Sequence, residues 1–273
     1  DAADHGAEIR TRCQVTRLER MGAVWRIETP QGAFSVRSVI NAAGPSVLGI
    51  LGRSDEKPKQ SIRLVRGSHI VVRKLFDHDY AYFFQLPDGR IFFAIPYEQD
   101  FTLIGTTDVD HEGSLAEVKA SPEEIAYLCE GASEYFRTSV TPADVVWTYS
   151  GVRPLVDDGS GKPEAATRGY RFEIDGGAKG EAPLLSVFGG KITTYRELSA
   201  EAVRQLAPFC AVLAGADWTG SAPLPGGDFD RFGAPALARD LALHHGLRGD
   251  ARVVGARQDE GVEAQHPLAP TER

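Results

Sequence analysis

The sequence predicts a mixed fold, of the α/β class in one part of the chain and of the α+β class in the other. Residues 62–106 show four successive strand patterns separated by turn signals, which is typical of an antiparallel sheet. Residues 38–43 form a short apolar strand that ends in small residues, which indicates one buried parallel strand. Residues 184–206 run from an apolar strand through two glycines into a helical pattern.

The composition is that of a globular protein. The chain has 273 residues, 42% hydrophobic and 25% charged, which suffices for one large domain or two small ones. We find no apolar run of about 18 residues, so no transmembrane helix is expected. A net charge of −8 argues against nucleic acid as the main partner. Cys13, Cys129 and Cys210 lie far apart, and we expect small buried residues rather than disulfides or a metal site.

The first 45 residues predict a β-meander that leads into the buried parallel strand. Alternating apolar residues over 8–18 predict the first strand, and 23–28 and 33–37 predict the next two. Gly22 and the Pro30–Gly32 segment supply the turns between them.

Residues 62–174 predict an antiparallel sheet with one helix. The strands are expected at 62–72, 82–86, 90–97, 101–106, 145–149 and 169–174. Poor alternation over 91–95 predicts that both faces of the sheet are covered. Ser121, Pro122 and Glu124 form a helix start with a capping box. The helix places six apolar residues on one face, namely Ile125, Leu128, Cys129, Ala132, Tyr135 and Phe136.

The last third of the chain predicts two helices and a tail. The strand 184–188 runs through two glycines and a lysine into a helix over 193–206, which Pro208 ends. A further helix is expected over 234–245. Residues 247–273 are polar and without periodicity, so we expect a disordered tail.

The glycines and the lysine after strand 184–188 are the most informative local feature. Gly189 and Gly190 have no Cβ, so the backbone can approach a ligand closely. The following helix N-terminus and Lys191 add positive charge, which suits a phosphate or an electron-rich ring oxygen. A plain turn with a solvated lysine explains this segment equally well.

Four further segments are compatible with a ligand site, although ordinary structure explains each one alone. Residues 41–45 (Asn-Ala-Ala-Gly-Pro) form a turn that tight loop packing accounts for. Arg153, expected between a strand and a proline-stiffened turn, suits phosphate or carboxylate, but a single arginine is more often in an ion pair. His69, among apolar neighbours, is a satisfied core residue or a general base. Residues 105–108 bind a ligand or cap a turn.

Taken in order, these segments resemble the FAD-dependent glycerol-3-phosphate dehydrogenases, most closely the aerobic, quinone-linked bacterial kind. The matching segments are 63–72, 74–82, 93–98, 101–108, 150–155 and 186–196. Residues 41–45 match the FAD-domain turn of this family, and the similarity extends from Gly6 to Gly246. Because several long motifs occur in the same order, the match is specific.

The resemblance implies FAD as cofactor and a role for each matching residue. The residues expected along FAD are Val15, at the adenine end through its backbone, then Ala42, Ala43, Gly44, Gly189, Gly190, Lys191, Ile192 and Thr193. Arg153 would hold the substrate phosphate. His69 would accept the proton of the C2 hydroxyl while a hydride leaves C2. Lys191 is the alternative for that role, or polarises the oxygen.

The implied reaction is oxidation of sn-glycerol 3-phosphate to dihydroxyacetone phosphate, with electrons passed to quinone. The implied parts are the remainder of a FAD-binding Rossmann-like domain (1–45 and 183–209), an antiparallel substrate domain (46–182) and the start of a helical C-terminal domain (210–246). The implied location is cytoplasmic. Peripheral contact with the inner face of the cytoplasmic membrane, and a homodimer, stay open. We expect neither a metal nor nucleic acid.

The sequence departs from the family's pattern at both ends. No Gly-x-Gly-x-x-Gly segment follows a strand and opens a helix, and the arginine and tyrosine that the family's N-terminal part adds to the substrate site are missing. Residue 1 is not methionine, and the C-terminal pattern breaks off after residue 246. We therefore expect an internal piece of the enzyme, or the product of a partial reading frame, inactive by itself.

Two other functions stay compatible with the sequence. A related FAD-dependent amine or amino-acid oxidase would use Arg153 to hold a carboxylate, although the long match around His69 disfavours it. A non-catalytic remnant or anion-binding module would keep the arginine without using the cofactor.

A flavin spectrum of the purified chain tests the expected loss of cofactor affinity. The missing glycine segment would supply the main anion site for the FAD pyrophosphate, so the chain should bind FAD weakly or not at all. A stoichiometric, bound yellow flavin would contradict this expectation.

Overall fold

The computed structural model describes residues 2–54, 56–157, 168–176, 180–224, 226–230 and 233–244. One compact unit is Ile9–Thr219, and the other combines the first eight residues with Gly220–Arg273. The second unit includes helix α4 (Ala234–His244), close to the predicted 234–245. The predicted tail, 247–273, lies outside the described residues. No helix in the described part is both long and apolar enough to cross a membrane.

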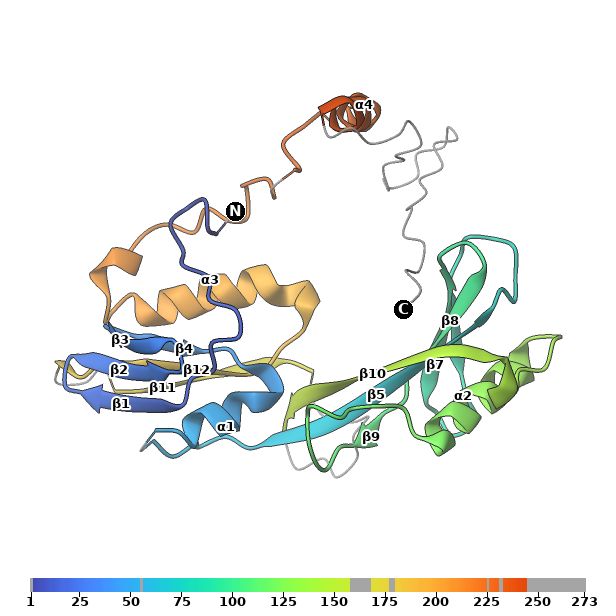
Figure 1. The fold of residues 1–273 in the computed structure, drawn as a ribbon, viewed down its shortest axis with the longest axis horizontal. Helices are drawn as coiled ribbons and strands as arrows, with labels where there is room; N and C mark the ends of the chain where they lie inside the picture. Colours follow the sequence, from blue (N-terminus) through green and yellow to red (C-terminus); the bar gives the residue numbers. More distant parts are fainter. Residues whose placement is uncertain are drawn as a thin grey trace. The chain divides into compact units, whose positions relative to one another are not determined.

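The unit Ile9–Thr219 begins with the predicted β-meander (Figure 1). Its antiparallel strands are β1 (Arg17–Met21), β2 (Val24–Thr29) and β3 (Gly32–Val36). The predicted strand over 8–18 is wrong for most of its length. Arg12 adopts a left-handed φ of 53°, Ile9 is 68% exposed, and the ladder with β2 begins only at Arg17. Alternation alone did not make a strand there because the segment lacks a pairing partner.

A second small sheet contains the predicted parallel strand. Its order is β11 (Tyr170–Asp175), β12 (Leu184–Gly189) and β4 (Val39–Asn41), with β4 and β12 parallel. The sequence analysis assigned 169–174 to the antiparallel substrate part, whereas β11 pairs with β12 in the structure. Two short helical elements follow β4: η1 (Gly44–Ser46) and α1 (Val47–Leu51).

Strand β12 is buried on both faces. Leu185 and Val187 pack against helix α3 (Tyr195–Leu206), which the short 3-10 turn η5 (Ile192–Thr194) precedes. Leu184 and Phe188 point the other way, into a cluster with the meander and α1. Because alternate residues of a strand face opposite sides, this strand needs apolar residues on both faces, and its sequence has them at every buried position except Ser186.

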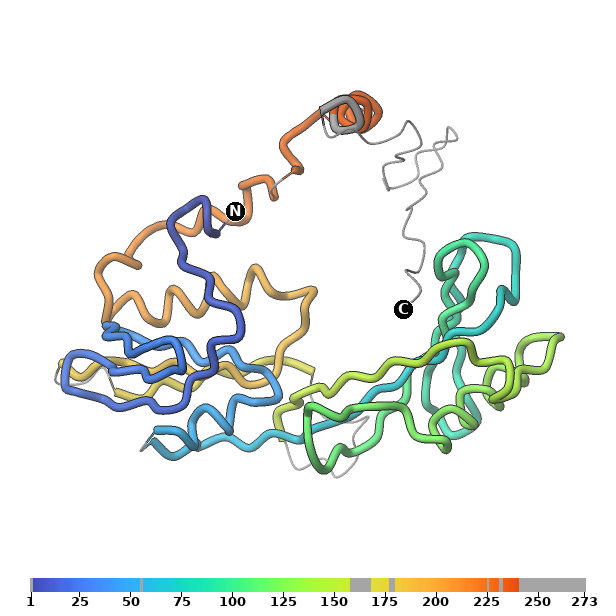
Figure 2. Tube along the Cα trace, viewed as in Figure 1, coloured from blue at the N-terminus to red at the C-terminus, as the bar shows by residue number. Residues whose placement is uncertain are grey.

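The larger sheet is antiparallel, as predicted, with the order β10-β5-β8-β7-β6 and β9 paired to β5. Its strands are β5 (Ile62–Arg73), β6 (Tyr82–Gln85), β7 (Ile91–Tyr97), β8 (Phe101–Gly105), β9 (Val109–Asp110) and β10 (Val145–Val156). Strand β10 is much longer than the predicted 145–149. It runs beside β5 for the length of that strand (Figure 2), so Arg153 lies within a strand rather than beside a turn.

Helix α2 (Pro122–Tyr135) covers one face of the larger sheet and begins with the predicted capping box. The Ser121 hydroxyl accepts a hydrogen bond from the Glu124 amide at 3.2 Å, and the Glu124 carboxylate accepts one from the Ser121 amide at 3.0 Å. The core beneath contains Ile70, Val72, Leu86, Phe92, Ala94, Ile104, Leu128, Cys129, Ala132 and Val140. The opposite face is not covered as predicted: Ile91, Phe93 and Ile95 are 43%, 37% and 37% exposed.

Trp25 anchors the meander to the second sheet. Its indole is 1% exposed, and its N–H donates to the carbonyls of Ala182 at 3.1 Å and Pro183 at 3.2 Å. The guanidinium of Arg20 lies 4.4 Å from the indole centre and donates to Asp175 at 2.7 Å. One buried aromatic ring therefore joins three separate chain segments.

We expect Trp25→Ala to lower the free energy of unfolding by about 3–5 kcal/mol because it leaves a large cavity, while each carbonyl keeps a second donor in the Arg20 Nε or the Val39 amide. Urea denaturation followed by circular dichroism measures the change. Val212, 74% exposed, is the control, since Val212→Ala should change stability by less than about 0.5 kcal/mol. Equal, small effects of the two substitutions would refute the anchoring role.

Candidate active site

His69 and Arg153 share the face of the larger sheet that lies opposite α2, called the outer face below. His69 on β5 pairs with Tyr149 of β10 on one side and with Gly105 of β8 on the other, while Arg153 of β10 pairs with Val65. Directly opposite residues, and every second residue of a strand, point to the same side of a sheet. The register therefore brings together two of the three predicted catalytic residues.

The imidazole of His69 is held between two neighbours. It stacks on the Tyr149 ring, with 4.7 Å between ring centres and 7° between planes. On the other side it lies over Gly105, where a Cβ atom would stand 2.2 Å from the ring. Only glycine leaves room for the ring at that position. The Nδ1 atom of His69 is buried and makes no hydrogen bond among the described residues.

This environment keeps His69 neutral. Burial lowers the pKa of its imidazole, and the positive charge of Arg153 lowers it further. A histidine with a lowered pKa is unprotonated at neutral pH and can accept a proton. The environment therefore meets the protonation requirement for a general base.

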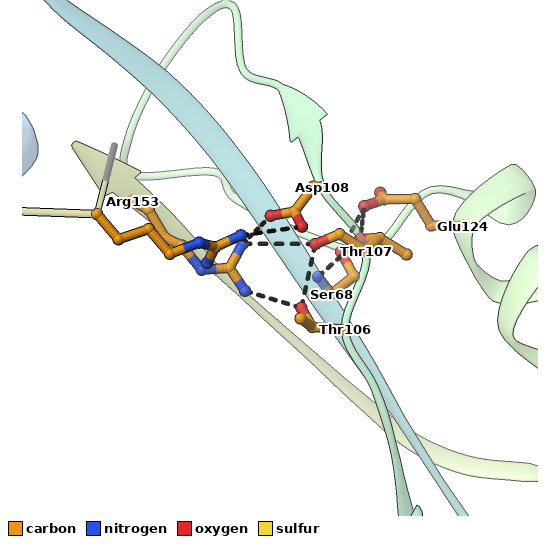
Figure 3. A network of polar contacts seen from close by, with 7 residues as sticks. Ser68, Thr106, Thr107, Asp108, Glu124 and Arg153 are labelled. Carbon is orange, nitrogen blue, oxygen red and sulfur yellow. Dashed lines mark hydrogen bonds and ion pairs between the residues drawn. The ribbon is translucent and has the colours of Figure 1, made fainter. Parts of the chain in front are cut away.

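Arg153 is bound to the loop that follows β8 (Figure 3). Its guanidinium donates to the Asp108 carboxylate at 2.8 Å and to the Thr106 hydroxyl at 2.9 Å. The guanidinium lies over Gly67, where a Cβ would stand 2.3 Å from it. Arg168 donates to the other oxygen of Asp108 at 3.3 Å. Two guanidinium groups thus meet at one carboxylate and leave a net positive charge.

The distance between the two functional groups follows from the sheet geometry. The guanidinium stands over Gly67, two residues along β5 from His69, and the imidazole leans one strand further, over Gly105. Two residues along a strand and one strand spacing across it correspond to roughly 8 Å. That separation suits a short phosphate ester whose hydroxyl and phosphate are a few bonds apart.

The predicted turn at 41–45 follows the parallel strand β4. The Asn41 side chain is buried, donates to the Val47 carbonyl at 3.0 Å and accepts from the Ala43 amide at 3.4 Å. Ala42 and Ala43 are exposed, and Gly44 has a φ of +54°, which glycine adopts freely. A buried amide thus holds a turn of small, accessible residues at the end of a strand.

The second glycine segment follows the neighbouring strand β12. Gly189 and Gly190 have φ values of +75° and +100°, and a Cβ on Gly189 would lie 2.5 Å from the Gly169 carbonyl oxygen. Lys191 and Thr193 after them are exposed, and Ile192 is 85% exposed. The N-cap residue Thr194 makes no side-chain hydrogen bond to α3, and the Tyr195 amide donates to the Ile192 carbonyl of the preceding turn.

The two turns lie at the same edge of the sheet, because β4 and β12 are parallel neighbours. Ligands of open α/β sheets bind at the carboxyl ends of such strands. The predicted residues Ala42 to Gly44 and Gly189 to Thr193 are therefore brought together. Lys191 makes no hydrogen bond or ion pair with His69 or Arg153 in the part of the chain that the structure describes.

Val15 lies apart from these turns in sequence, just before β1. It is half-buried against the cluster that contains Trp25, and its carbonyl accepts a hydrogen bond from the Arg53 guanidinium. That carbonyl keeps a second lone pair for another donor.

The described residues include no group of three or more His, Cys, Asp or Glu side chains arranged to hold a metal ion. The three cysteines are free, with Cys129 and Cys210 buried and Cys13 half-buried.

The chain belongs to the FAD-dependent oxidoreductase family, whose model matches residues 1–196. It is 45% identical over 248 residues to a glycerol-3-phosphate dehydrogenase of Pseudomonas aeruginosa, covering 88% of this chain and 48% of that protein. It is 40% identical over 283 residues to a D-erythritol 1-phosphate dehydrogenase of Brucella abortus, covering 96% of this chain and 56% of that protein. The chain thus spans about half the length of the curated relatives it matches.

The fold resembles that of two solved structures. A glycerol-3-phosphate dehydrogenase of Bacillus halodurans complexed with FAD superposes with a TM-score of 0.72 at 25% identity, covering 90% of this chain and 48% of that one. A glycine oxidase of Geobacillus kaustophilus, at 19% identity and a TM-score of 0.53, shares the fold.

The sheet edge fits FAD, the cofactor of this family. Accessible backbone at two small-residue turns, the positive end of α3 and an exposed lysine form a set suited to electron-rich ring oxygens. Exposed Ile192 adds an apolar surface for a flat ring. Ala42, Ala43 and Gly44 line one side of this set, and Gly189 and Gly190 the other.

Three residues of the site escaped the sequence analysis. Asp108 was named only within the run 105–108, with two interpretations as a ligand contact or a turn cap, Arg168 was not singled out, and Glu124 was assigned to helix capping alone. Each acts through partners at least 15 residues away in sequence, which a local motif does not reveal. The run of short polar residues at 105–108 was the available signal.

We expect the His69 imidazole to titrate below the ordinary histidine value of about 6.5, because burial and Arg153 disfavour its charged form. Its folded pKa lies below its unfolded pKa, so between the two values the unfolded state binds more protons. His69 therefore lowers the stability of the fold as pH falls through that window. NMR titration of the ring Cε1–H signal, assigned with His69→Gln, measures the midpoint.

Variants of the stacked tyrosine sharpen this test. Tyr149→Ala opens one face of the His69 ring to water and should raise the midpoint, whereas Tyr149→Phe keeps the ring and should leave it unchanged. A wild-type midpoint at or above the free value would show that the environment does not hold His69 neutral.

Proposed function

We propose that this chain carries the substrate site of an enzyme that oxidises sn-glycerol 3-phosphate to dihydroxyacetone phosphate, with FAD as cofactor and quinone as electron acceptor. The observation that carries the proposal is the pairing of a neutral imidazole with a guanidinium pair on one sheet face. The 45% identity to a glycerol-3-phosphate dehydrogenase supports the same substrate.

Arg153 is the proposed anchor for the substrate phosphate. Burial lowers the pKa of its guanidinium, an effect that Asp108 opposes and Arg168 reinforces, and the group stays charged at neutral pH. A phosphate dianion offers more charge and more acceptor oxygens than the single Asp108 carboxylate. It can therefore compete for both guanidinium groups while Asp108 keeps Arg153 in place.

His69 is the proposed base for the C2 hydroxyl. With the phosphate on Arg153, the roughly 8 Å to the imidazole is spanned by a three-carbon ester together with its hydrogen bonds at each end. The imidazole takes the hydroxyl proton as the C2–H bond breaks. Lys191 is the alternative base, or polarises the same oxygen. FAD, when bound, supplies the acceptor for the hydride that leaves C2.

The proposed cofactor contacts are those at the shared edge of β4 and β12. Ala42, Ala43 and Gly44 would contact FAD, and Gly189, Gly190, Lys191, Ile192 and Thr193 would hold its isoalloxazine part, with Val15 toward the adenine part. The Lys191 charge and the positive end of α3 would favour the negative charge that a reduced flavin carries. A cytoplasmic location, peripheral membrane contact and a homodimer remain proposals that rest on the family resemblance alone.

A second substrate within the same chemical class is a four-carbon polyol phosphate. The 40% identity to a D-erythritol 1-phosphate dehydrogenase, over 96% of this chain, favours this candidate over an amino acid. Both esters carry a phosphate and a nearby secondary hydroxyl. The two esters would use Arg153 and His69 in the same way, and they differ in length by one carbon.

Ligand binding to the 273-residue chain discriminates between these functions. Isothermal titration calorimetry with sn-glycerol 3-phosphate, D-erythritol 1-phosphate and glycine should give heat for at least the first ester and none for the amino acid. Binding of glycine without either ester would support the amino-acid oxidase instead. Dihydroxyacetone phosphate formed by the chain in the presence of FAD would exclude a non-catalytic remnant.

We expect Gly67→Ala to weaken binding of sn-glycerol 3-phosphate by about tenfold, the effect of losing one good charged hydrogen bond. The new methyl group would stand 2.3 Å from the guanidinium, which is the end of a flexible side chain and moves away. Stability should therefore change little. Gly151→Ala is the control: it adds the same methyl to the opposite position of the ladder, where nothing lies within 4 Å. Equal affinities for both variants and the wild type would contradict the phosphate anchor.

A further inference from the structure

Glu124 is a buried carboxylate beneath the sheet, on the face opposite His69 and Arg153. It is 4% exposed and belongs to the first turn of α2. Ser68 and His69 are consecutive on β5, so their side chains point to opposite faces. The Ser68 hydroxyl donates to Glu124 at 2.8 Å, which fixes this carboxylate on the α2 side.

Helix capping uses only part of this carboxylate. Its Oε2 atom accepts from the Ser121 amide at 3.0 Å and pairs with the Arg66 guanidinium at 2.8 Å. Its Oε1 atom accepts from the hydroxyls of Ser68 at 2.8 Å and Thr107 at 2.6 Å. Burial acts to raise the pKa of Glu124, but the accepted hydrogen bonds, foremost that from Thr107, outweigh burial and hold the pKa below its ordinary value. The group is therefore ionised at neutral pH.

The two hydroxyls on Oε1 belong to the two segments that carry the active site. Ser68 directly precedes His69. Thr107 stands between Thr106 and Asp108, both of which bind Arg153 (Figure 3). The segments are also joined directly, since the Ser68 amide donates to the Thr107 hydroxyl at 2.9 Å. The Oε1 atom of Glu124 thus links β5, which carries His69, to the loop after β8, whose residues bind Arg153.

We propose that Glu124 is a positioning residue, which fixes the spacing between His69 and the Arg153–Asp108 pair so that one phosphorylated polyol reaches both. The assignment rests on the proposed function for the identity of that ligand. Glu124 touches neither substrate nor cofactor and acts through Ser68 and Thr107. Ser150 extends the same network to β10, because its hydroxyl lies 2.8 Å from that of Ser68.

The test compares Glu124→Gln with Ser121→Ala in the 273-residue chain. The glutamine keeps the shape and loses the charge, while Ser121→Ala removes a hydroxyl cap of the same helix and leaves Oε1 untouched. We expect Glu124→Gln to weaken the affinity for sn-glycerol 3-phosphate by about tenfold, as loss of charged hydrogen bonds does. Ser121→Ala should stay within about twofold of the wild type, although both variants lower the melting temperature.

NMR signals of the His69 ring and the Arg153 Nε–H provide a readout that needs no ligand. Both signals should shift in Glu124→Gln and stay in place in Ser121→Ala. If the wild type binds no sn-glycerol 3-phosphate, the proposed function fails, and these two signals still decide the role of Glu124. Thr107→Val removes one donor to Oε1, together with the acceptor of the Ser68 amide, without touching the cap, and should act like Glu124→Gln if the latter does not fold. Unchanged signals in the glutamate and threonine variants, or equal shifts in all three, would overturn the proposal.

Discussion

The antiparallel ladder between β5 and β10 is the constraint on which the site depends. Its register pairs Tyr149 with His69 and Gly151 with Gly67, and it places Arg153 two residues further along the same face. A slip of β10 by one residue would turn Tyr149 and Arg153 toward the α2 face, away from His69. The Ile62–Val156 end of the ladder reaches the cluster formed by the meander, α1 and β12. There Val156 and Ile62 pack with Leu184 and Phe188. The strands that carry His69 and Arg153 are thus continuous with the packing beneath the turns that follow β4 and β12.

The two faces of the larger sheet have different tasks. On the outer face, Gly67 and Gly105 have no side chain. The Arg153 guanidinium and the His69 imidazole therefore have room to lie flat on the sheet. On the α2 face, the apolar core and the buried Glu124 resist movement of the same strands. A small ligand that uses two groups on the outer face gains affinity from this arrangement, because those groups lose little freedom when it binds.

Local signals in the sequence predicted most of the elements but not their partners. The capping box at Ser121 and Glu124 and the run 184–188 were reliable because helix starts and fully buried strands depend on neighbouring residues. The strand over 8–18 failed because a strand also needs a partner, and β10 was too short in the prediction because Gly151 and Pro154 look like turn residues until β5 pairs with them. Of the site, His69 and Arg153 were found through the family resemblance. Asp108, Arg168 and Glu124 required the tertiary contacts.

The central claim is that one small ligand engages His69 and Arg153 together. An NMR titration of the 273-residue chain with sn-glycerol 3-phosphate tests it most directly, with the His69 ring and the Arg153 Nε–H signals followed in the same samples. We predict that both signals shift and that both curves give the same dissociation constant. A shift of only one signal, or two signals that saturate at different ligand concentrations, would contradict the claim.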